Sequence, residues 1–117
     1  MSEEIEYYET APRDIVVTND ALEYGNIEAW KNIIESYQSS HPNHQVVILY
    51  EGEEVHNILA MFKMHKHPNR FAFQLVVRAT DSNWKDVPKL YRFLVEGGSN
   101  KYNRYIEKDL YQVLKLF

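Results

Sequence analysis

Three apolar runs between residues 45 and 79 constrain the fold more than any other feature. The runs are Gln45–Tyr50, His56–His65 and Arg70–Ala79. They are rich in β-branched and aromatic residues, which favour strands. Gly52 lies among acidic residues between the first two runs, and Pro68 with Asn69 lies between the last two, as is typical of turns. Short links between consecutive strands predict an antiparallel meander.

The alternation of side chains predicts that this sheet is covered on both faces. A strand with one wet face alternates apolar and polar residues. Here Leu59 and Met61 are apolar and point away from Phe62, and Val76 points away from Phe73. Either helices or a second copy of the chain must therefore shield the second face.

Flanking segments predict an α+β fold, with a mainly antiparallel sheet of four to five strands packed with three helices. Apolar residues recur at helical spacing over about 26–39, 86–96 and 100–116. Asp14–Thr18 reads as a further strand, and Met1–Thr10 as an edge strand or a tail. The length suits a single domain over residues 1–117.

The ends of the expected helices carry capping signals. Asn26 is placed to cap the first helix. Asp86 is placed to cap the second, with Pro88 in its first turn. Gly97 follows that helix and predicts a left-handed cap.

Composition predicts a soluble cytoplasmic protein. There is no cysteine, which excludes disulfides, zinc–thiolate sites and thiol chemistry. The acidic start Met1–Glu6 does not resemble a signal peptide. No run approaches the roughly 18 apolar residues of a membrane span.

Charge is distributed unevenly along the chain. Residues 1–62 hold twelve acidic and two basic residues, whereas residues 63–92 hold two acidic and seven basic ones. A basic segment can bind nucleic acid through its phosphates. The residues assigned to such a site are Lys63, Lys66, Arg70, Arg78, Lys85 and Lys89. The alternative interpretation is that the acidic and basic segments lie near each other in the fold or between subunits.

Histidine pairs raise the question of a metal. His65 and His67 flank one residue at an expected turn, and His41 with His44 forms a second pair in a loop. A full zinc site needs three or four ligands, and no carboxylate lies within either pair. We therefore interpret these side chains as solvated loop histidines and assign no metal, although the sequence does not settle whether His65 and His67 bind one.

No catalytic or cofactor motif is present. The sequence lacks a nucleophile elbow, a zinc-protease motif and a P-loop. Its four glycines all lie at expected turns, so no loop is suited to phosphate. No cofactor is assigned, and the lack of these motifs favours a protein that is not an enzyme.

Nine tyrosines and the two-sided sheet favour protein binding. The residues assigned to such a contact are Leu59, Met61, Val76, Tyr105 and Tyr111. The leading hypothesis is a small adaptor or regulatory protein that binds a protein partner and self-associates as a homodimer. Nucleic-acid binding through residues 63–92, and a small-molecule or enzymatic pocket between sheet and helices, are the alternatives.

Overall fold

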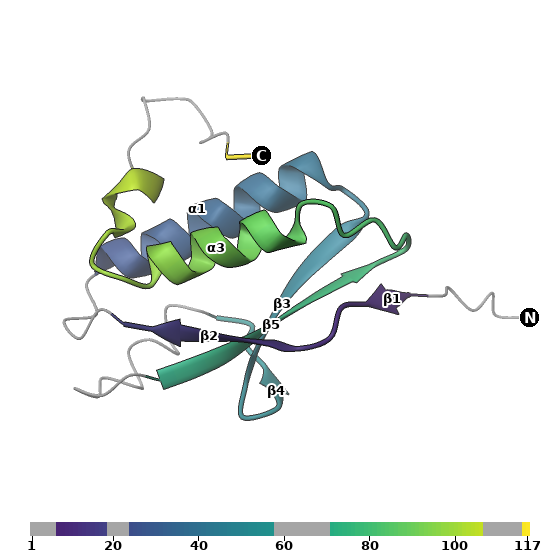
Figure 1. Ribbon diagram of the computed structural model, residues 1–117, viewed down its shortest axis with the longest axis horizontal. Helices are drawn as coiled ribbons and strands as arrows, with labels where there is room; N and C mark the ends of the chain where they lie inside the picture. Colours follow the sequence, from purple (N-terminus) through teal and green to yellow (C-terminus); the bar gives the residue numbers. More distant parts are fainter. Residues whose placement is uncertain (1–6, 19–23, 58–70, 107–115) are drawn as a thin grey trace, which may run out of the picture.

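The computed structural model describes residues 7–18, 24–57, 71–106 and 116–117, and in this part of the chain two α-helices cover one face of an antiparallel sheet (Figure 1). The elements in order are β1 (Tyr8–Glu9), β2 (Arg13–Val17), α1 (Tyr24–Ser40), β3 (His44–Tyr50), β4 (Glu53–Glu54), β5 (Phe71–Ala79), α3 (Val87–Gly97) and the 3₁₀ helix η1 (Tyr102–Tyr105). The α+β class and the mainly antiparallel sheet are confirmed.

The order of the strands differs from a meander. β5 pairs with β3 on one side and with both β1 and β2 on the other, and β4 pairs with the outer side of β3. The expected first and third strands are thus direct neighbours, with Val46 opposite Val77. The expected middle strand lies outside the described residues from residue 58 onward, and Val55–Asn57 are not in a strand. An apolar run indicates a strand but does not indicate which strand lies next to it. The runs that form β3 and β5 alternate in the same way, so each suits the same buried face of the sheet.

The turn after β3 has the conformation expected of a tight hairpin. Glu51 and Gly52 both have positive φ, of 51° and 84°. Two such residues are typical of the two-residue turn that matches the twist of paired strands. Tyr50 consequently pairs with Glu53 across it.

A bulge separates β1 from β2 along the same edge of β5. Glu9 lies opposite Arg78 and Arg13 opposite Leu75, so that three residues face two. Thr10 holds the bulge, because its N–H donates to the Val77 carbonyl at 3.0 Å and its hydroxyl accepts from the Val77 N–H at 2.9 Å. Pro12, which lacks an N–H, lies in the extra stretch.

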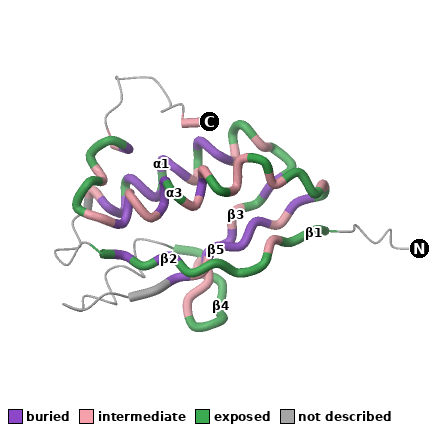
Figure 2. Tube along the Cα trace, viewed as in Figure 1, coloured by how far each residue is buried: buried purple, intermediate pink, exposed green. Residues whose placement is uncertain are grey.

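The core lies between the sheet and the two helices, where Figure 2 shows the buried inner sides of α1 and α3. The largest fully buried side chains include Trp30, Tyr37, Phe73 and Tyr105. The Trp30 and Phe73 rings meet edge to face at 5.4 Å, and Trp30 Nε1 donates to the Leu94 carbonyl at 2.9 Å. The tryptophan therefore ties both helices to the sheet.

The face of the sheet away from the helices is also shielded near its centre. Val47 and Val76 lie opposite each other on β3 and β5, and both are buried. They alternate with core residues, so their side chains point away from α1 and α3. At this position a single chain provides the cover that the sequence requires.

The predicted start of the first helix is wrong. α1 begins at Tyr24, and Asn26 lies within it. The Asn26 amide is fully buried and donates to the carbonyls of Gly97 and Ser99, both at 2.9 Å. A residue interpreted as a cap in fact joins α1 to the end of α3.

The predicted third helix, over 100–116, is not present as one helix in the described residues. Tyr102–Tyr105 forms a single 3₁₀ helix, and residues 107–115 lie outside the described part of the chain. The Ile106 N–H bonds to the Asn103 carbonyl, and Asn32 Nδ2 donates to the Tyr105 carbonyl at 2.9 Å. These bonds hold the segment as one tight turn against α1.

The left-handed cap predicted at Gly97 is also wrong, because among the described glycines only Gly52 has a positive φ. A Cβ at position 97 would lie 2.9 Å from Cδ1 of Ile33 and 3.2 Å from Cδ1 of Trp30. Glycine at this position allows close packing of the end of α3 on α1.

Candidate functional site

Arg78, one of the residues assigned to nucleic acid, is engaged within the sheet. Its guanidinium donates to Glu9 at 2.7 Å and to Glu54 at 3.1 Å. These two hydrogen bonds, first the one to Glu9 and next the one to Glu54, raise the pKa of Arg78 above its ordinary range. Arg78 therefore links β1 to β4, and the acidic and basic parts of the chain meet here.

The basic residues on α3 and just before it are placed differently. Lys85 and Arg92 are exposed. The Lys89 ammonium lies 5.5 Å from the ring centre of Phe93 and 5.4 Å from that of Phe117, within reach of a cation–π contact. The other residues assigned to nucleic acid, Lys63, Lys66 and Arg70, lie outside the described residues.

The two described residues assigned to protein binding are both buried. Val76 lies in the covered centre of the sheet, and Tyr105 is completely enclosed. The Tyr105 hydroxyl has no hydrogen-bond partner among the described residues. Burial, and next the charge of Glu96, raise the pKa of Tyr105 to about 12. Leu59, Met61 and Tyr111 lie outside the described part.

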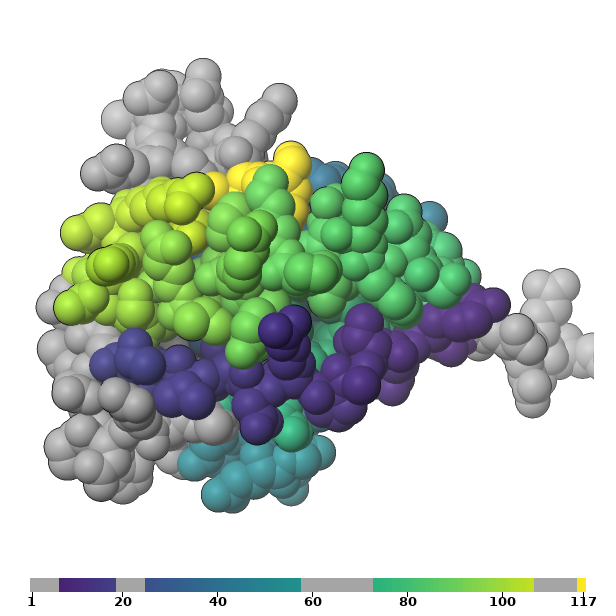
Figure 3. Space-filling model, in the orientation of Figure 1, coloured from purple at the N-terminus to yellow at the C-terminus, as the bar shows by residue number. Residues whose placement is uncertain are grey.

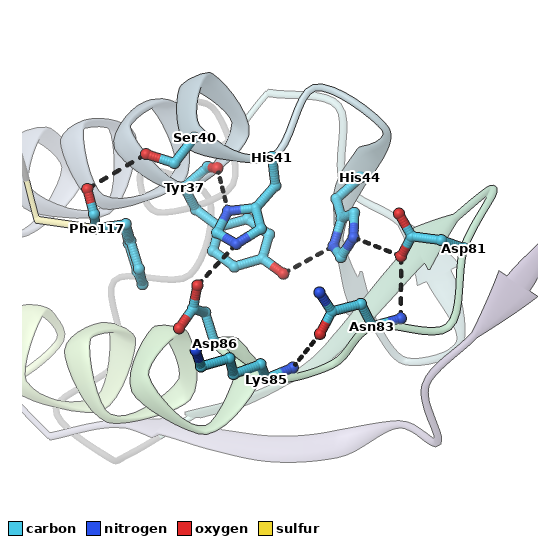
Figure 4. A network of polar contacts seen from close by, with 9 residues as sticks. All are labelled: Tyr37, Ser40, His41, His44, Asp81, Asn83, Lys85, Asp86 and Phe117. Carbon is cyan, nitrogen blue, oxygen red and sulfur yellow. Dashed lines mark hydrogen bonds and ion pairs between the residues drawn. The ribbon is translucent and has the colours of Figure 1, made fainter.

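The most connected group of titratable side chains lies where α1, β3 and the loop before α3 meet (Figure 4). We call it the polar cluster. Its members are Tyr37, His41, His44, Asp81 and Asp86. It is built from two histidines, each bonded to an aspartate, on either side of one tyrosine.

The inner half of the polar cluster contains His44, whose side chain is only 3% exposed. Its Nδ1 lies 2.8 Å from the Tyr37 hydroxyl, and its Nε2 lies 3.0 Å from Asp81 Oδ1. Burial, followed by the charges of Asp86 and Asp81, raises the pKa of Tyr37 to about 12. The phenol therefore keeps its proton at neutral pH and can donate it to Nδ1.

The outer half contains His41, which follows the last residue of α1. Its ring stacks on Tyr37, with ring centres 4.2 Å apart and an interplanar angle of 13°. Its Nδ1 lies 2.9 Å from the Tyr37 carbonyl, and its Nε2 lies 2.8 Å from Asp86 Oδ2. It is 5.1 Å from the His44 ring.

Local turns in the loop after β5 place the aspartates. The Asn83 N–H donates to Asp81 Oδ1 at 3.0 Å, and the Lys85 N–H donates to Asn83 Oδ1 at 3.2 Å. Asp, Asn and Ser favour such turns because a short side chain can bond to the backbone two residues on. The Asn83 N–H, and next His44, lower the pKa of Asp81 below its ordinary value of 3.8. Asp81 is therefore ionised at neutral pH.

The series Asp81–His44–Tyr37 has the connectivity of a catalytic relay, but its position does not suit one. A nucleophile must contact its substrate, whereas Tyr37 is fully buried and His44 nearly so. Nor are any three histidine or carboxylate side chains of the described residues arranged so that they could hold a metal ion together. Physically, the polar cluster holds three elements together.

The sequence identified His41 and His44 but not their partners. The interpretation of them as solvated loop histidines is wrong, because both are tied to aspartates and His44 is buried. The only sequence feature that pointed to the partners was the position of Asp81 and Asp86 at an expected turn and an expected helix cap. This position does not indicate which histidine each aspartate contacts. His65 and His67 lie outside the described residues.

A second feature lies on the edge formed by β1 and β2, which crosses the front of the molecule below α3 (Figure 3). The exposed large hydrophobic residues of the described chain all lie here: Tyr7 at 58%, Tyr8 at 48% and Val16 at 36% exposed. Glu9, Arg13 and Asp14 are exposed beside them. We call these six residues the edge strip.

Backbone groups along β2 are partly occupied. The Tyr91 hydroxyl donates to the Asp14 carbonyl at 3.0 Å, and the Thr18 N–H donates to the Gly98 carbonyl at 2.9 Å. The Arg13 guanidinium lies 3.6 Å from the centre of the Tyr91 ring. These bonds cover part of the β2 edge, which hinders the addition of another strand there. The exposed side chains of the edge strip are not affected.

Neither α1 nor α3, nor any other helix in the described ranges, has the length and hydropathy needed to cross a membrane.

Comparison with known proteins identifies a family. Residues 8–104 match the family described as "Uncharacterised Treponema protein C-terminal domain". A protein of Treponema pallidum (strain Nichols), described as "Uncharacterized protein", is 33% identical over 103 residues. The aligned region is 88% of this chain and 29% of that relative, so the chain spans less than a third of its length. No solved structure matches the chain. The family match covers most of the chain, and the protein therefore belongs to the "Uncharacterised Treponema protein C-terminal domain" family.

Proposed function

We propose that this chain is a non-enzymatic protein-binding domain, with an adaptor or regulatory role, that self-associates through the edge strip. The observation that carries the proposal is the concentration of exposed large hydrophobic residues, Tyr7, Tyr8 and Val16, on one edge. Tyrosine suits protein contacts because it buries a large area and keeps a polar tip. The absence of a catalytic motif from the sequence adds to this.

The charges of the edge strip favour a second copy as the occupant. Arg13 lies between the acidic residues Glu9 and Asp14 along the strip. In a two-fold dimer each strip faces itself in the opposite direction. Arg13 of one copy can then lie near an acidic residue of the other, without a row of like charges meeting. The absence of cysteine suits a reducing compartment, and we place the protein in the cytoplasm as part of this proposal.

Sedimentation velocity over a range of concentrations tests self-association. We expect the wild type to shift from monomer to dimer, and a variant with Tyr8→Ser and Val16→Lys to remain monomeric. Lys31→Ser, on the exposed side of α1, is the matched control and should dimerise like the wild type. A wild type that remains monomeric at every concentration would overturn the proposal, as would a variant that dimerises normally.

A second function, nucleic-acid binding, is favoured by one observation. Lys85, Lys89 and Arg92 are spaced so that they share one side of α3 and its entry, and two of them are exposed. We expect a fluorescent single-stranded oligonucleotide to bind at low salt and to be released as salt rises. Replacing all three by alanine should weaken binding, whereas Lys31→Ala should not. Absence of binding at low salt would end this alternative.

A further inference from the structure

His41 is held between two oxygen atoms that can only accept hydrogen bonds. One is the backbone carbonyl of Tyr37, 2.9 Å from Nδ1, and the other is a carboxylate oxygen of Asp86, 2.8 Å from Nε2. A neutral imidazole carries one N–H and one lone pair. A neutral His41 would therefore point a lone pair at an oxygen in either tautomer. Both contacts are favourable only when both ring nitrogens of His41 carry a proton, as in an imidazolium beside the Asp86 carboxylate.

The Tyr37 carbonyl fixes this requirement, because it cannot be turned away. It also accepts the backbone N–H of His41 at 2.9 Å, as the last part of the helical pattern of α1. A carbonyl has two lone pairs and can take both bonds. The unpaired carbonyls at a helix C-terminus also favour a cation at this position.

The Asp86 carboxylate bonds to His41 and does not cap its own helix. It is the N-cap residue of α3, yet its side chain makes no capping hydrogen bond. An N-cap carboxylate normally accepts an N–H from the first turn of its own helix. Here the carboxylate reaches the end of α1, so the bond to His41 joins the end of one helix to the start of the other (Figure 4).

Among the described residues, titratable and charged groups face His41 from α1, β3, the loop before α3, and α3 itself. Tyr37 lies on α1, His44 on β3, and Asp81 and Asp86 in the loop before α3. From α3, Lys89 lies over the ring of Phe117, which in turn is 6.3 Å from the His41 ring. Within this described part of the chain two aspartates and one lysine lie around the ring, and His44 is bonded satisfactorily when neutral. The cluster therefore accommodates one imidazolium, at His41.

We propose that His41 is a pH-sensitive latch that joins α1 to α3 only when both of its ring nitrogens carry protons. Histidine changes charge between about pH 5 and 8. When His41 loses a proton, either the bond to Tyr37 or the bond to Asp86 becomes a contact between two acceptors. The α1–α3 junction then loosens. This inference does not depend on the proposed self-association.

Urea unfolding at pH 5.5 and 8.5 tests the latch. We expect the wild type to have a lower unfolding midpoint at pH 8.5, and most of this difference to disappear in His41→Gln and in Asp86→Asn. His56→Gln is the matched control, because the His56 side chain is 83% exposed and lies 3.9 Å from Glu54; it should keep the pH dependence. A pH difference that persists in both latch variants would overturn the proposal.

The protonation of His41 can also be read directly by ¹⁵N spectroscopy of the imidazole nitrogens, with no variant that must fold. We expect both ring nitrogens of His41 to be protonated at pH 5.5, where its bonds to the Tyr37 carbonyl and to Asp86 are both favourable. His44 should show one protonated and one unprotonated nitrogen at the same pH. A His41 with one unprotonated ring nitrogen at pH 5.5, or a doubly protonated His44 in its place, would contradict the latch.

Discussion

The two histidine–aspartate pairs of the polar cluster use the same side chains but have opposite requirements for protons. His44 lies between Asp81 and a hydroxyl, and His41 lies between Asp86 and a carbonyl. A hydroxyl can donate, so His44 is satisfied as a neutral ring. A carbonyl cannot, so His41 needs two protons. The second partner, rather than the aspartate, decides the charge state of each histidine.

This difference predicts opposite responses to pH. The inner contact between His44 and Asp81 requires an ionised carboxylate, and it weakens in acid as Asp81 takes up a proton. The outer contact requires an imidazolium, and it weakens as the pH rises through the range in which histidine titrates. The inner and outer contacts therefore weaken in opposite directions of pH.

Tyr37→Phe should have the largest effect, because it removes the donor that lets His44 remain neutral. The variant leaves Nδ1 of a buried ring without a partner. We expect a loss of about 1–3 kcal/mol in the free energy of unfolding, measured by urea titration at pH 7.

Tyr91→Phe provides the matched control for that measurement. It also removes a tyrosine hydroxyl bonded across the fold, but its partner, the Asp14 carbonyl, lies on the exposed edge of β2 where water can replace it. We expect a smaller loss than in Tyr37→Phe. Equal unfolding midpoints for Tyr37→Phe and the wild type would show that His44 does not depend on this donor.

Raising the pH should test the contribution of the Tyr37 hydroxyl to stability in a second way, with a smaller effect than its removal. The pKa of Tyr37 is raised from 10.0 to about 12 in the folded protein. The stability that comes from its neutral phenol is thus fully present below pH 10 and is lost as the pH rises from 10 to about 12. The advantage of the wild type over Tyr37→Phe in urea should shrink between pH 9.5 and 11.5. Tyr105 is present in both proteins, so its own raised pKa cancels. A constant advantage across this range would contradict the prediction.

Much of the fold could be predicted from the sequence, because it depends on local patterns. The spacing of Trp30, Ile33 and Tyr37 indicates α1, and Gly52 indicates the hairpin turn. The pairing of β3 with β5 could not be predicted, because it depends on which of several apolar strands occupies the centre. The role of Asn26 was missed for a related reason, since its partners lie 71 and 73 residues away.

The polar cluster shows the same limit more sharply. His41 and His44 were identified because they are close in sequence. Asp81 and Asp86 lie 37 and 45 residues from the histidines that they contact. Sequence spacing suggested a metal or open solvent for the pair, because it contains no information about acceptors brought in by another loop. The buried phenol of Tyr37, which separates the two charge states, is an ordinary core position in the helical pattern.

Protonation of Asp81 at low pH should have the smallest effect on stability, because its side chain is accessible to solvent. Its pKa is lowered from 3.8, first by the Asn83 N–H and next by His44. The stability that this carboxylate contributes is present above pH 3.8 and is lost as the pH falls through its lower folded value. Carboxyl ¹³C titration of Asp81 by NMR should therefore give a midpoint below 3.8. Replacing His44 by glutamine, which removes the ring nitrogen that lies 3.0 Å from Asp81 Oδ1, should move the midpoint only part of the way back, because the Asn83 N–H remains. A midpoint at or above 3.8 in the wild type would mean that the inner pair does not need its ionised carboxylate, and the contrast with His41 would then rest on the outer pair alone.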